Sequence, residues 1–163
     1  MDIDWSKQHC GVKKAPFNEV IKLMPDLIPI LESFPDDHLN FTWDIKVHML
    51  MPRQYPCIPH WHCDNIPREN GIQRFEKSNP EFPMYLWISG APLTQFRNGY
   101  IQPKKWVKFN QLDEHRGTAA DDFCWRCFIR ATDKNIYAPC DIPGYDFQRR
   151  HSQVYLDEDT YQW

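Results

Sequence analysis

Long apolar runs, glycine and a strong charge bias are all scarce in this sequence, and each scarcity excludes a class of protein. No apolar segment approaches the ~20 residues that a helix needs to cross a membrane, and the N-terminal residues lack the basic and then apolar pattern of a secretory signal. We therefore expect a cytoplasmic protein with no membrane partner. The formal net charge is -3, so we expect no strong patch for binding nucleic acid.

Glycine is also outnumbered by proline, with six glycines against fourteen prolines. Proline lacks a backbone N–H and interrupts helices, so this composition favours short elements joined by stiff loops over a helical bundle. Hydrophobic residues still make up 42% of the 163 residues, which is enough apolar material for a sizeable core. We expect residues 1–163 to form a single domain.

The cysteines show no disulfide framework. In the cytosol thiols stay reduced, so we interpret them as free thiols or metal ligands. The six cysteines are Cys10, Cys57, Cys63, Cys124, Cys127 and Cys140.

Apolar residues recur at helical spacing near the N-terminus and then alternate as in strands. Residues 17–24 predict one helix, which Pro25 should end, and a second short helix follows over 26–31. After residue 37 the pattern becomes alternating and rich in aromatic and β-branched residues. The predicted strands are Phe41–Met51, Met84–Ser89, Gly99–Gln102, Trp106–Gln111, Cys124–Ala131 and a late segment, Arg150–Leu156.

This order of elements predicts a mainly β fold, a sandwich or barrel, with a helical cover at the N-terminus. We expect residues 1–36 to form the cover and residues 41–131 to form the core. We do not expect a parallel α/β sheet, because no segment between the strands is long enough for a connecting helix.

The densest group of metal-ligating side chains lies in residues 57–64. On an extended strand, residues two apart face the same way, so His62 and Asp64 could bind one metal ion. His60 lies on the same face. A pair of solvated or core histidines is the simpler alternative.

Three basic or ligating residues follow later in the chain. His115 offers another imidazole, and Arg126 and Arg130 share one face of a predicted strand. Buried arginines are costly unless an anion pairs with them, and a planar carboxylate fits the guanidinium fork. An exposed strand face that carries solubilising charges is the alternative.

Two histidines and one carboxylate with open positions are the ligand set of non-haem Fe(II) oxygenases. The order His62-x-Asp64, His115 and Arg126 resembles the 2-oxoglutarate/Fe(II)-dependent dioxygenases, and residues 85–94 resemble the strand and turn that follow the HxD motif in that family. The Trp-Arg-x-Phe-x-Arg segment is similar to small phage-encoded members. The resemblance covers residues 41–131 and implies a double-stranded β-helix, or jelly roll, with N-terminal helices.

The resemblance also implies the roles of individual residues. His62, Asp64 and His115 would bind Fe(II), and Arg126, with Arg130 as the alternative, would bind the distal carboxylate of 2-oxoglutarate. The implied reaction is oxidative decarboxylation of 2-oxoglutarate to succinate, coupled to hydroxylation of a small-molecule or nucleotide substrate. Further co-substrate contacts are expected from Tyr85 or Thr94, and substrate contacts from His60, Arg68, Trp87 and Arg97.

A cupin-like binding module without turnover is a second hypothesis. Its histidines would serve recognition of a small anionic ligand or of a protein partner, as in a phage-encoded inhibitor. Cupin relatives also suggest a different metal set, in which His60 pairs with His62 and Glu69 adds a fourth ligand. The anion pocket would be lined by Arg68, Trp87, Arg97 and Tyr100.

Three smaller alternatives involve the cysteines and the last histidine. Cys124-x-x-Cys127 has the spacing of a zinc half-site, with Cys57, His60 or Cys63 as the other half. Cys63 could act as a thiolate nucleophile beside His60 or His62. His151 could replace His115 as the distal ligand, although no arginine follows it.

Overall fold

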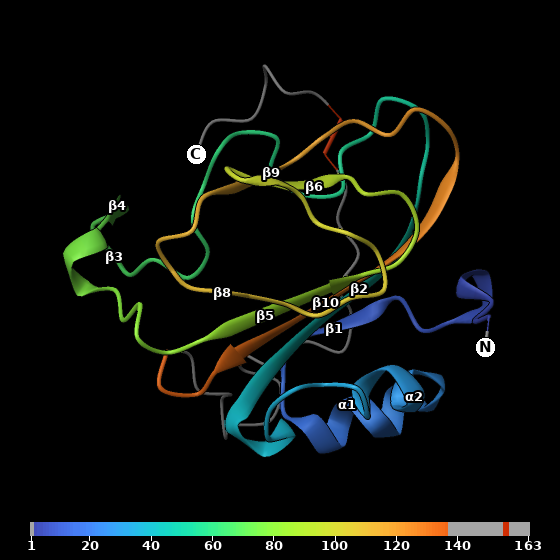
Figure 1. Cartoon of the computed structure of the whole chain (residues 1–163), viewed down its shortest axis with the longest axis horizontal. Helices are drawn as coiled ribbons and strands as arrows, with labels where there is room; N and C mark the ends of the chain where they lie inside the picture. Colours follow the sequence, from blue (N-terminus) through green and yellow to red (C-terminus); the bar gives the residue numbers. More distant parts are fainter. Residues whose placement is uncertain (1, 137–154, 157–163) are drawn as a thin grey trace.

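The computed structural model describes residues 2–136 and 155–156 and shows a mainly β protein with antiparallel sheets and a few short helices (Figure 1). The larger sheet has the strand order β1-β2-β10-β5-β8, and the smaller sheet has the order β7-β6-β9. The mainly β prediction is therefore confirmed. The strands of the larger sheet are β1 (Gly11–Ala15), β2 (Phe41–Leu50), β5 (Met84–Ile88), β8 (Val107–Phe109) and β10 (Cys124–Asp133).

The remaining elements are short. The smaller sheet consists of β6 (Thr94–Phe96), β7 (Gly99–Tyr100) and β9 (His115–Gly117), and a separate hairpin pairs β3 (Arg68–Glu69) with β4 (Ile72–Gln73). The α-helices are α1 (Phe17–Leu23) and α2 (Ile28–Leu31), and the 3-10 turns are η1 (Trp5–Lys7), η2 (Pro25–Leu27), η3 (His38–Asn40) and η4 (Phe75–Lys77).

The N-terminal cover is only partly helical. Helix α1 forms where the helical spacing predicts it, and Pro25 begins the next turn, η2. Gly11–Ala15, in contrast, pairs with β2 as a strand that the sequence did not predict. Two adjacent lysines at its centre break the alternation by which strands are recognised. Of the predicted strand Arg150–Leu156, residues 150–154 lie outside the described residues, and Tyr155 bridges to Tyr55.

One face of the larger sheet is covered by the N-terminal helices (Figure 1). Phe34 lies at the centre of this layer, and its ring contacts those of Phe41, Trp43, Tyr85 and Trp106 at centroid distances of 5.0–5.1 Å. Burial of each large apolar side chain stabilises the fold by roughly 1.5–3 kcal/mol. Residues 17–31 contribute Val20, Met24, Leu27 and Leu31, and the strands contribute Trp43, Ile45, Val47, Cys127, Ile129 and Ala131.

Four of the pairings after residue 40 are nested one inside another, and the separate β3–β4 hairpin lies outside this pattern. β2 pairs with β10, His62 pairs with His115, β5 pairs with β8, and β6 pairs with β7. Residues 41–133 therefore fold like one long hairpin, whose successive segments lie alternately in the larger and the smaller sheet.

The second face of the larger sheet looks toward the smaller sheet and is partly polar. Met84, Leu86 and Ile88 of β5 pack there against Phe96 and Phe109. On β2 and β10 the same face carries buried polar side chains, which are Thr42, Asp44, Lys46, His48, Arg126 and Thr132. This polar region between the two sheets positions the candidate site.

Candidate metal centre

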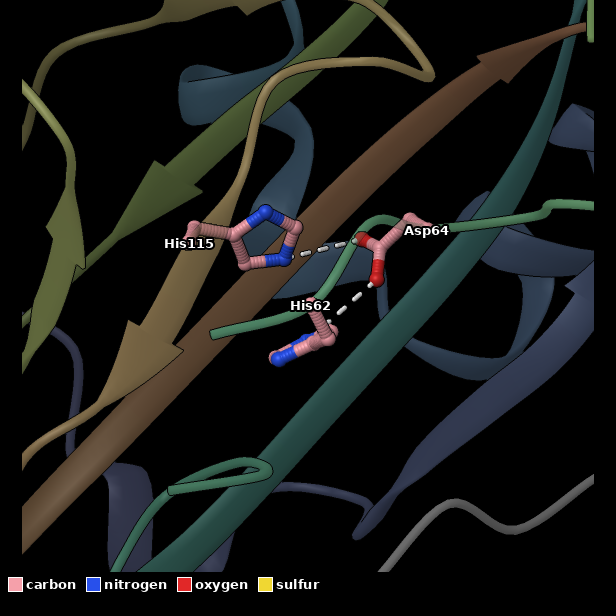
Figure 2. Close-up of side chains that lie close together, drawn as sticks. All are labelled: His62, Asp64 and His115. Atoms are coloured by element: carbon pink, nitrogen blue, oxygen red, sulfur yellow. Dashed lines mark ion pairs between the residues drawn. The ribbon is translucent and has the colours of Figure 1, made fainter. Parts of the chain in front are cut away.

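His62, Asp64 and His115 lie together between the two sheets, and their side chains point toward one another (Figure 2). Each residue offers one ligand atom, and these atoms all lie within 4.8 Å of one another. A two-residue antiparallel bridge holds the histidines side by side, because each backbone N–H donates to the other residue's carbonyl, at 3.0 and 2.9 Å. The triad could therefore hold a metal ion.

Both imidazole rings are oriented by backbone carbonyls. His62 Nδ1 lies 2.7 Å from the His60 carbonyl, and His115 Nδ1 lies 3.2 Å from the Asp113 carbonyl. A carbonyl can only accept, so in each ring Nδ1 carries the proton and donates it. Nε2 then faces Asp64, at 3.6 Å for His62 and 3.3 Å for His115. This arrangement, with Nδ1 held outside and Nε2 directed inward, is typical of metal-ligating histidines.

The charges of the triad are strongly coupled. Burial opposes ionisation of Asp64, but the positive charges of His115 and Arg130 outweigh it and hold the Asp64 pKa well below its usual value. Burial also opposes protonation of His115, yet the Asp64 carboxylate raises the His115 pKa. For His62 burial prevails and lowers the pKa. The carboxylate is thus ionised, as metal binding requires.

Arg130 connects the triad to a second carboxylate. Its Nη1 donates to Asp64 Oδ2 at 2.8 Å, and its Nη2 donates to Asp44 Oδ2 at 2.9 Å. Asp44 is only 1% exposed and also accepts the Lys14 backbone N–H, at 3.1 Å. Arg130 was the alternative partner for the 2-oxoglutarate carboxylate, but both of its Nη atoms are bound to protein carboxylates. We therefore interpret it as a residue that orients Asp64.

Arg126 is buried without a carboxylate partner among the residues that the structure describes. It is 0% exposed, and its Nη2 donates to Thr94 Oγ1 at 2.6 Å. Its Nε and Nη1 have no hydrogen-bond partner in the described part of the chain. Burial of this charge lowers the Arg126 pKa. A buried guanidinium with unpaired donors is energetically unfavourable unless an anion binds there.

The triad opens onto a cavity of about 460 Å³. Thr94, the partner of Arg126, lines this cavity together with His62, Asp64 and His115. A ligand in the cavity can therefore lie beside the triad and close to the Arg126–Thr94 pair. The other charged side chains of the wall are Lys13, Lys14, Asp44, Lys46 and Arg130.

Tyr85 and Trp87 lie on the opposite face of the larger sheet, which corrects their predicted contacts with co-substrate and substrate. Both belong to the helix-covered layer, and the Tyr85 hydroxyl donates to Asp36 at 3.4 Å. In β5 the residues that face the triad's side are Met84, Leu86 and Ile88. All five residues of β5 are buried, so their hydrophobicity could not predict which of them face the helices and which face the triad.

The predicted substrate residues are spread over different parts of the molecule. His60 contacts the triad through its backbone carbonyl. Arg68 belongs to the exposed β3–β4 hairpin, where it donates to the Gly71 carbonyl at 2.8 Å. Arg97 lies over the Trp61 ring at 3.9 Å and pairs with Glu114. With Tyr100 it lines a different cavity of about 840 Å³.

The alternative metal and thiol sites do not assemble. Within the described ranges, the triad is the one group of three or more ligating side chains close enough to share a metal ion. Cys127 is buried in the helix-covered layer, whereas Cys124 approaches Gly90. Glu69 pairs with Arg74 and Lys77 in the β3–β4 region instead of adding a fourth ligand.

The nucleophile hypothesis and the distal-ligand alternative have different outcomes. Burial raises the pKa of the Cys63 thiol to about 11, which disfavours the thiolate that nucleophilic attack requires. His151 lies outside the described residues.

Sequence reasoning missed the polar residues of β2 and β1 that surround the triad. Asp44 and Lys46 alternate with apolar residues in β2, a pattern also typical of a strand with one solvated face. Lys13 and Lys14 lie in a strand that was not predicted. The position of a lysine along a strand does not show whether its side chain faces solvent or a cavity.

Comparison with known proteins identifies no family for this chain. No family model and no curated protein matches it. One solved structure, the crystal structure of protein NMB1881 from Neisseria meningitidis, is similar at 12% identity and a TM-score of 0.32 over 66% of this chain and 97% of its own. Among the described residues, no helix is long and apolar enough to span a membrane.

Proposed function

We propose that this protein is an Fe(II)/2-oxoglutarate-dependent dioxygenase built on a double-stranded β-helix. The nested pairings support the fold, because a long hairpin whose segments alternate between two facing sheets is the arrangement of a jelly roll. The β2–β10 pair is the outermost pairing of this hairpin, and the His62–His115 pair is the next.

The ligand set supports iron. Two imidazoles and one carboxylate on one side of a metal leave other positions open, as in non-haem Fe(II) oxygenases. Bound Fe(II) and 2-oxoglutarate would supply the oxidative decarboxylation that activates O₂ for hydroxylation of a C–H bond. The protein's residues bind and orient: His62, Asp64 and His115 hold the ion, and Arg130 fixes the rotation of the Asp64 carboxylate.

The buried Arg126 is the observation that supports 2-oxoglutarate as the co-substrate. Its Nε and Nη1 donors lack partners within the described residues, and its Nη2 is fixed by Thr94, which lines the triad's cavity. A guanidinium fork binds a carboxylate through two parallel hydrogen bonds. 2-Oxoglutarate has a second carboxylate, distant from the oxo-acid group that binds a metal, and Arg126 fits the role of its partner.

Anaerobic absorption spectroscopy tests the proposal. Addition of Fe(II) and then 2-oxoglutarate to the protein should produce a metal-to-ligand charge-transfer band in the visible. The Asp64→Ala variant should lack the band while retaining the far-UV circular dichroism of the wild type. If the wild-type protein folds but develops no band, or if Asp64→Ala develops the same band, the dioxygenase proposal is wrong.

The binding-module hypothesis is supported by one contact. Asp64 is already paired with Arg130, so the carboxylate has a counter-charge without any metal. If this function is the right one, affinity for a dicarboxylate such as succinate should survive His62→Ala combined with His115→Ala, and should be lost in Arg126→Met. A dioxygenase requires both histidines for metal-dependent binding of 2-oxoglutarate.

A further inference from the structure

Strand β1 contributes two consecutive lysines to the lining of the triad's cavity. Val12 pairs with Ile45 and Ala15 pairs with Trp43, so three steps along β1 correspond to two along β2, which defines a β-bulge. Val12 and Ala15 are both buried in the helix-covered layer. The two residues between them, Lys13 and Lys14, both line the cavity. In a regular strand, consecutive side chains would point to opposite faces.

The bulge requires an unfavourable backbone conformation. Lys14 has a φ of 59°, in the left-handed region that side chains with a Cβ rarely adopt. The backbone N–H of Lys14 donates to Asp44 Oδ1. The same Asp44 side chain accepts a hydrogen bond from Arg130 through Oδ2. Strained backbone at a bulge beside a ligand cavity is typical of functional sites.

A third lysine lies deeper in the same cavity. Lys46 is only 4% exposed, and its ammonium group donates to the Pro56 carbonyl at 2.7 Å and lies 5.5 Å from the centre of the Phe128 ring. Lys46 is paired in register with Gly11, two residues before the bulge. The three lysines therefore approach the cavity from two neighbouring strands.

The cavity is cationic although the whole chain is acidic. Its described lining holds four cationic side chains, Lys13, Lys14, Lys46 and Arg130, against two carboxylates, Asp44 and Asp64. Arg130 binds both carboxylates, and the chain as a whole has a formal net charge of -3. Positive charge concentrated in a cavity attracts an anionic ligand.

We propose that Lys13, Lys14 and Lys46 bind a phosphate group of the substrate, so that the enzyme acts on a small phosphorylated molecule. The identification of the occupant as the substrate rests on the proposed dioxygenase function. Lysine ammonium groups are compact, rotatable point charges, so several of them can converge on the oxygens of a tetrahedral phosphate. Arg126 is already assigned to the carboxylate of 2-oxoglutarate. A cavity of about 460 Å³ fits a small molecule.

Nuclear magnetic resonance of the ¹⁵N-labelled full chain tests the phosphate site with methyl phosphate as the probe. One titration uses the metal-free protein, and a second uses protein with Zn(II) and 2-oxoglutarate, because Zn(II) binds without redox chemistry. Methyl phosphate should cause saturable shifts of the Lys13, Lys14 and Asp44 amides, and acetate should bind at least about tenfold more weakly. Equal affinity for acetate would overturn the assignment of phosphate.

Two variants and one control test the residues. Lys13→Gln combined with Lys14→Gln should weaken methyl phosphate at least about tenfold, and Lys13→Gln alone, which leaves the strained Lys14 position unchanged, should weaken it at least about threefold. Lys22→Gln removes an exposed lysine of α1 on the helix side and should bind like the wild type. Unchanged affinity in the folded double variant would overturn the phosphate site.

The two titrations separate this inference from the dioxygenase proposal. Lysine-dependent binding of methyl phosphate to the metal-free protein supports the anion site even if 2-oxoglutarate fails to bind in the second titration. If 2-oxoglutarate binds with Zn(II) but methyl phosphate causes no saturable shift in either titration, the phosphate site is wrong and the dioxygenase proposal stands.

Discussion

The two faces of the larger sheet are made by the same strands and have opposite character. Toward the helices, alternate residues of β2 and β10 are apolar, such as Trp43, Ile45 and Ile129, and they form one continuous core. Toward the smaller sheet, the residues between them include Asp44, Lys46 and Arg126, all buried and polar. A period of two along each strand thus divides the sheet into an apolar and a polar layer.

The comparison separates stability from function. Apolar burial on the helix side stabilises the fold. Charges buried on the other side are unfavourable even when they are paired, and hydrophobic replacements of such pairs are often neutral or stabilising. The polar layer is therefore not accounted for by stability, whereas the proposed ligand site would account for it, and changes to the two faces should have different consequences.

The largest effect on stability should come from the helix side. Trp43 is fully buried in contact with Phe17 and Phe34, and Trp43→Ala should lower the free energy of unfolding by about 3–5 kcal/mol. Urea unfolding measures the loss. The fraction that remains folded should bind Zn(II) as the wild type does, and a weaker metal affinity of that fraction would show that the two layers are not independent.

A smaller effect should come from the buried ammonium group of Lys46. Burial lowers the Lys46 pKa from 10.5 to about 8, so between these values the unfolded chain binds a proton that the folded protein has released. Stability rises with pH where the unfolded state binds more protons. The free energy of unfolding of the wild type, relative to Lys46→Met, should therefore increase by roughly 3 kcal/mol from pH 8 to pH 10.5.

Chemical denaturation across this pH range checks the Lys46 prediction. Lys22→Met serves as the matched control, because Lys22 is exposed on α1 and its removal should give a difference that does not depend on pH. A Lys46→Met difference that is equally flat would contradict the burial of this charge.

Asp44 should affect metal binding indirectly. Asp44 accepts a hydrogen bond from Arg130, and Arg130 donates another to the proposed metal ligand Asp64. Asp44→Asn therefore weakens a contact that orients Arg130 and, through it, Asp64. Loss of such outer contacts typically lowers metal affinity by about 10- to 100-fold. Competition titrations with Zn(II) measure the change. Asp26→Asn, the same replacement at an exposed position on the helix side, should leave the affinity unchanged, and an equal loss in both variants would contradict the role of Asp44.

The smallest effect should follow from Tyr85→Phe. The Tyr85 hydroxyl makes one long hydrogen bond to Asp36 on the helix side, so its removal should change stability by less than about 1 kcal/mol and should leave 2-oxoglutarate affinity unchanged. Thr94→Val, which removes the acceptor of Arg126 Nη2, should weaken 2-oxoglutarate several-fold. Weaker binding in Tyr85→Phe, measured in the same anaerobic titration, would place Tyr85 at the site after all.

The sequence predicted the long strands and the triad for physical reasons. β2 and β10 have ten residues each, enough for a visible alternation, whereas β6 and β9 have three each and show none. His62 and Asp64 are two apart, so an extended segment would place them on one side. The structure brings them together although His62 forms only an isolated bridge and Asp64 lies in a bend. Their proximity to His115 depends on a single antiparallel bridge, and only the family resemblance implied it.

Other parts of the site depend on which strands are neighbours. The pairing of Arg130 with Asp44 follows from the β2–β10 register, where these residues are direct partners, and no local pattern reveals it. The misplacement of Tyr85 and Trp87 has a different cause. Every residue of β5 is buried, so hydrophobicity does not distinguish its two faces.

The expected preference of the buried Arg126 for a distal carboxylate tests the central claim most directly. We propose comparing the affinity of 2-oxoglutarate with that of pyruvate, a 2-oxo acid without the distal carboxylate, in anaerobic Fe(II) protein of the wild type and of Arg126→Met. The wild type should bind 2-oxoglutarate at least about tenfold more tightly than pyruvate, since a hydrogen bond to a charged group contributes about 1.5–3 kcal/mol. Arg126→Met should lose this preference and still bind both acids through the metal. Equal affinities in the wild type, or a preference that persists in Arg126→Met, would contradict the assignment of this polar layer to a 2-oxoglutarate site.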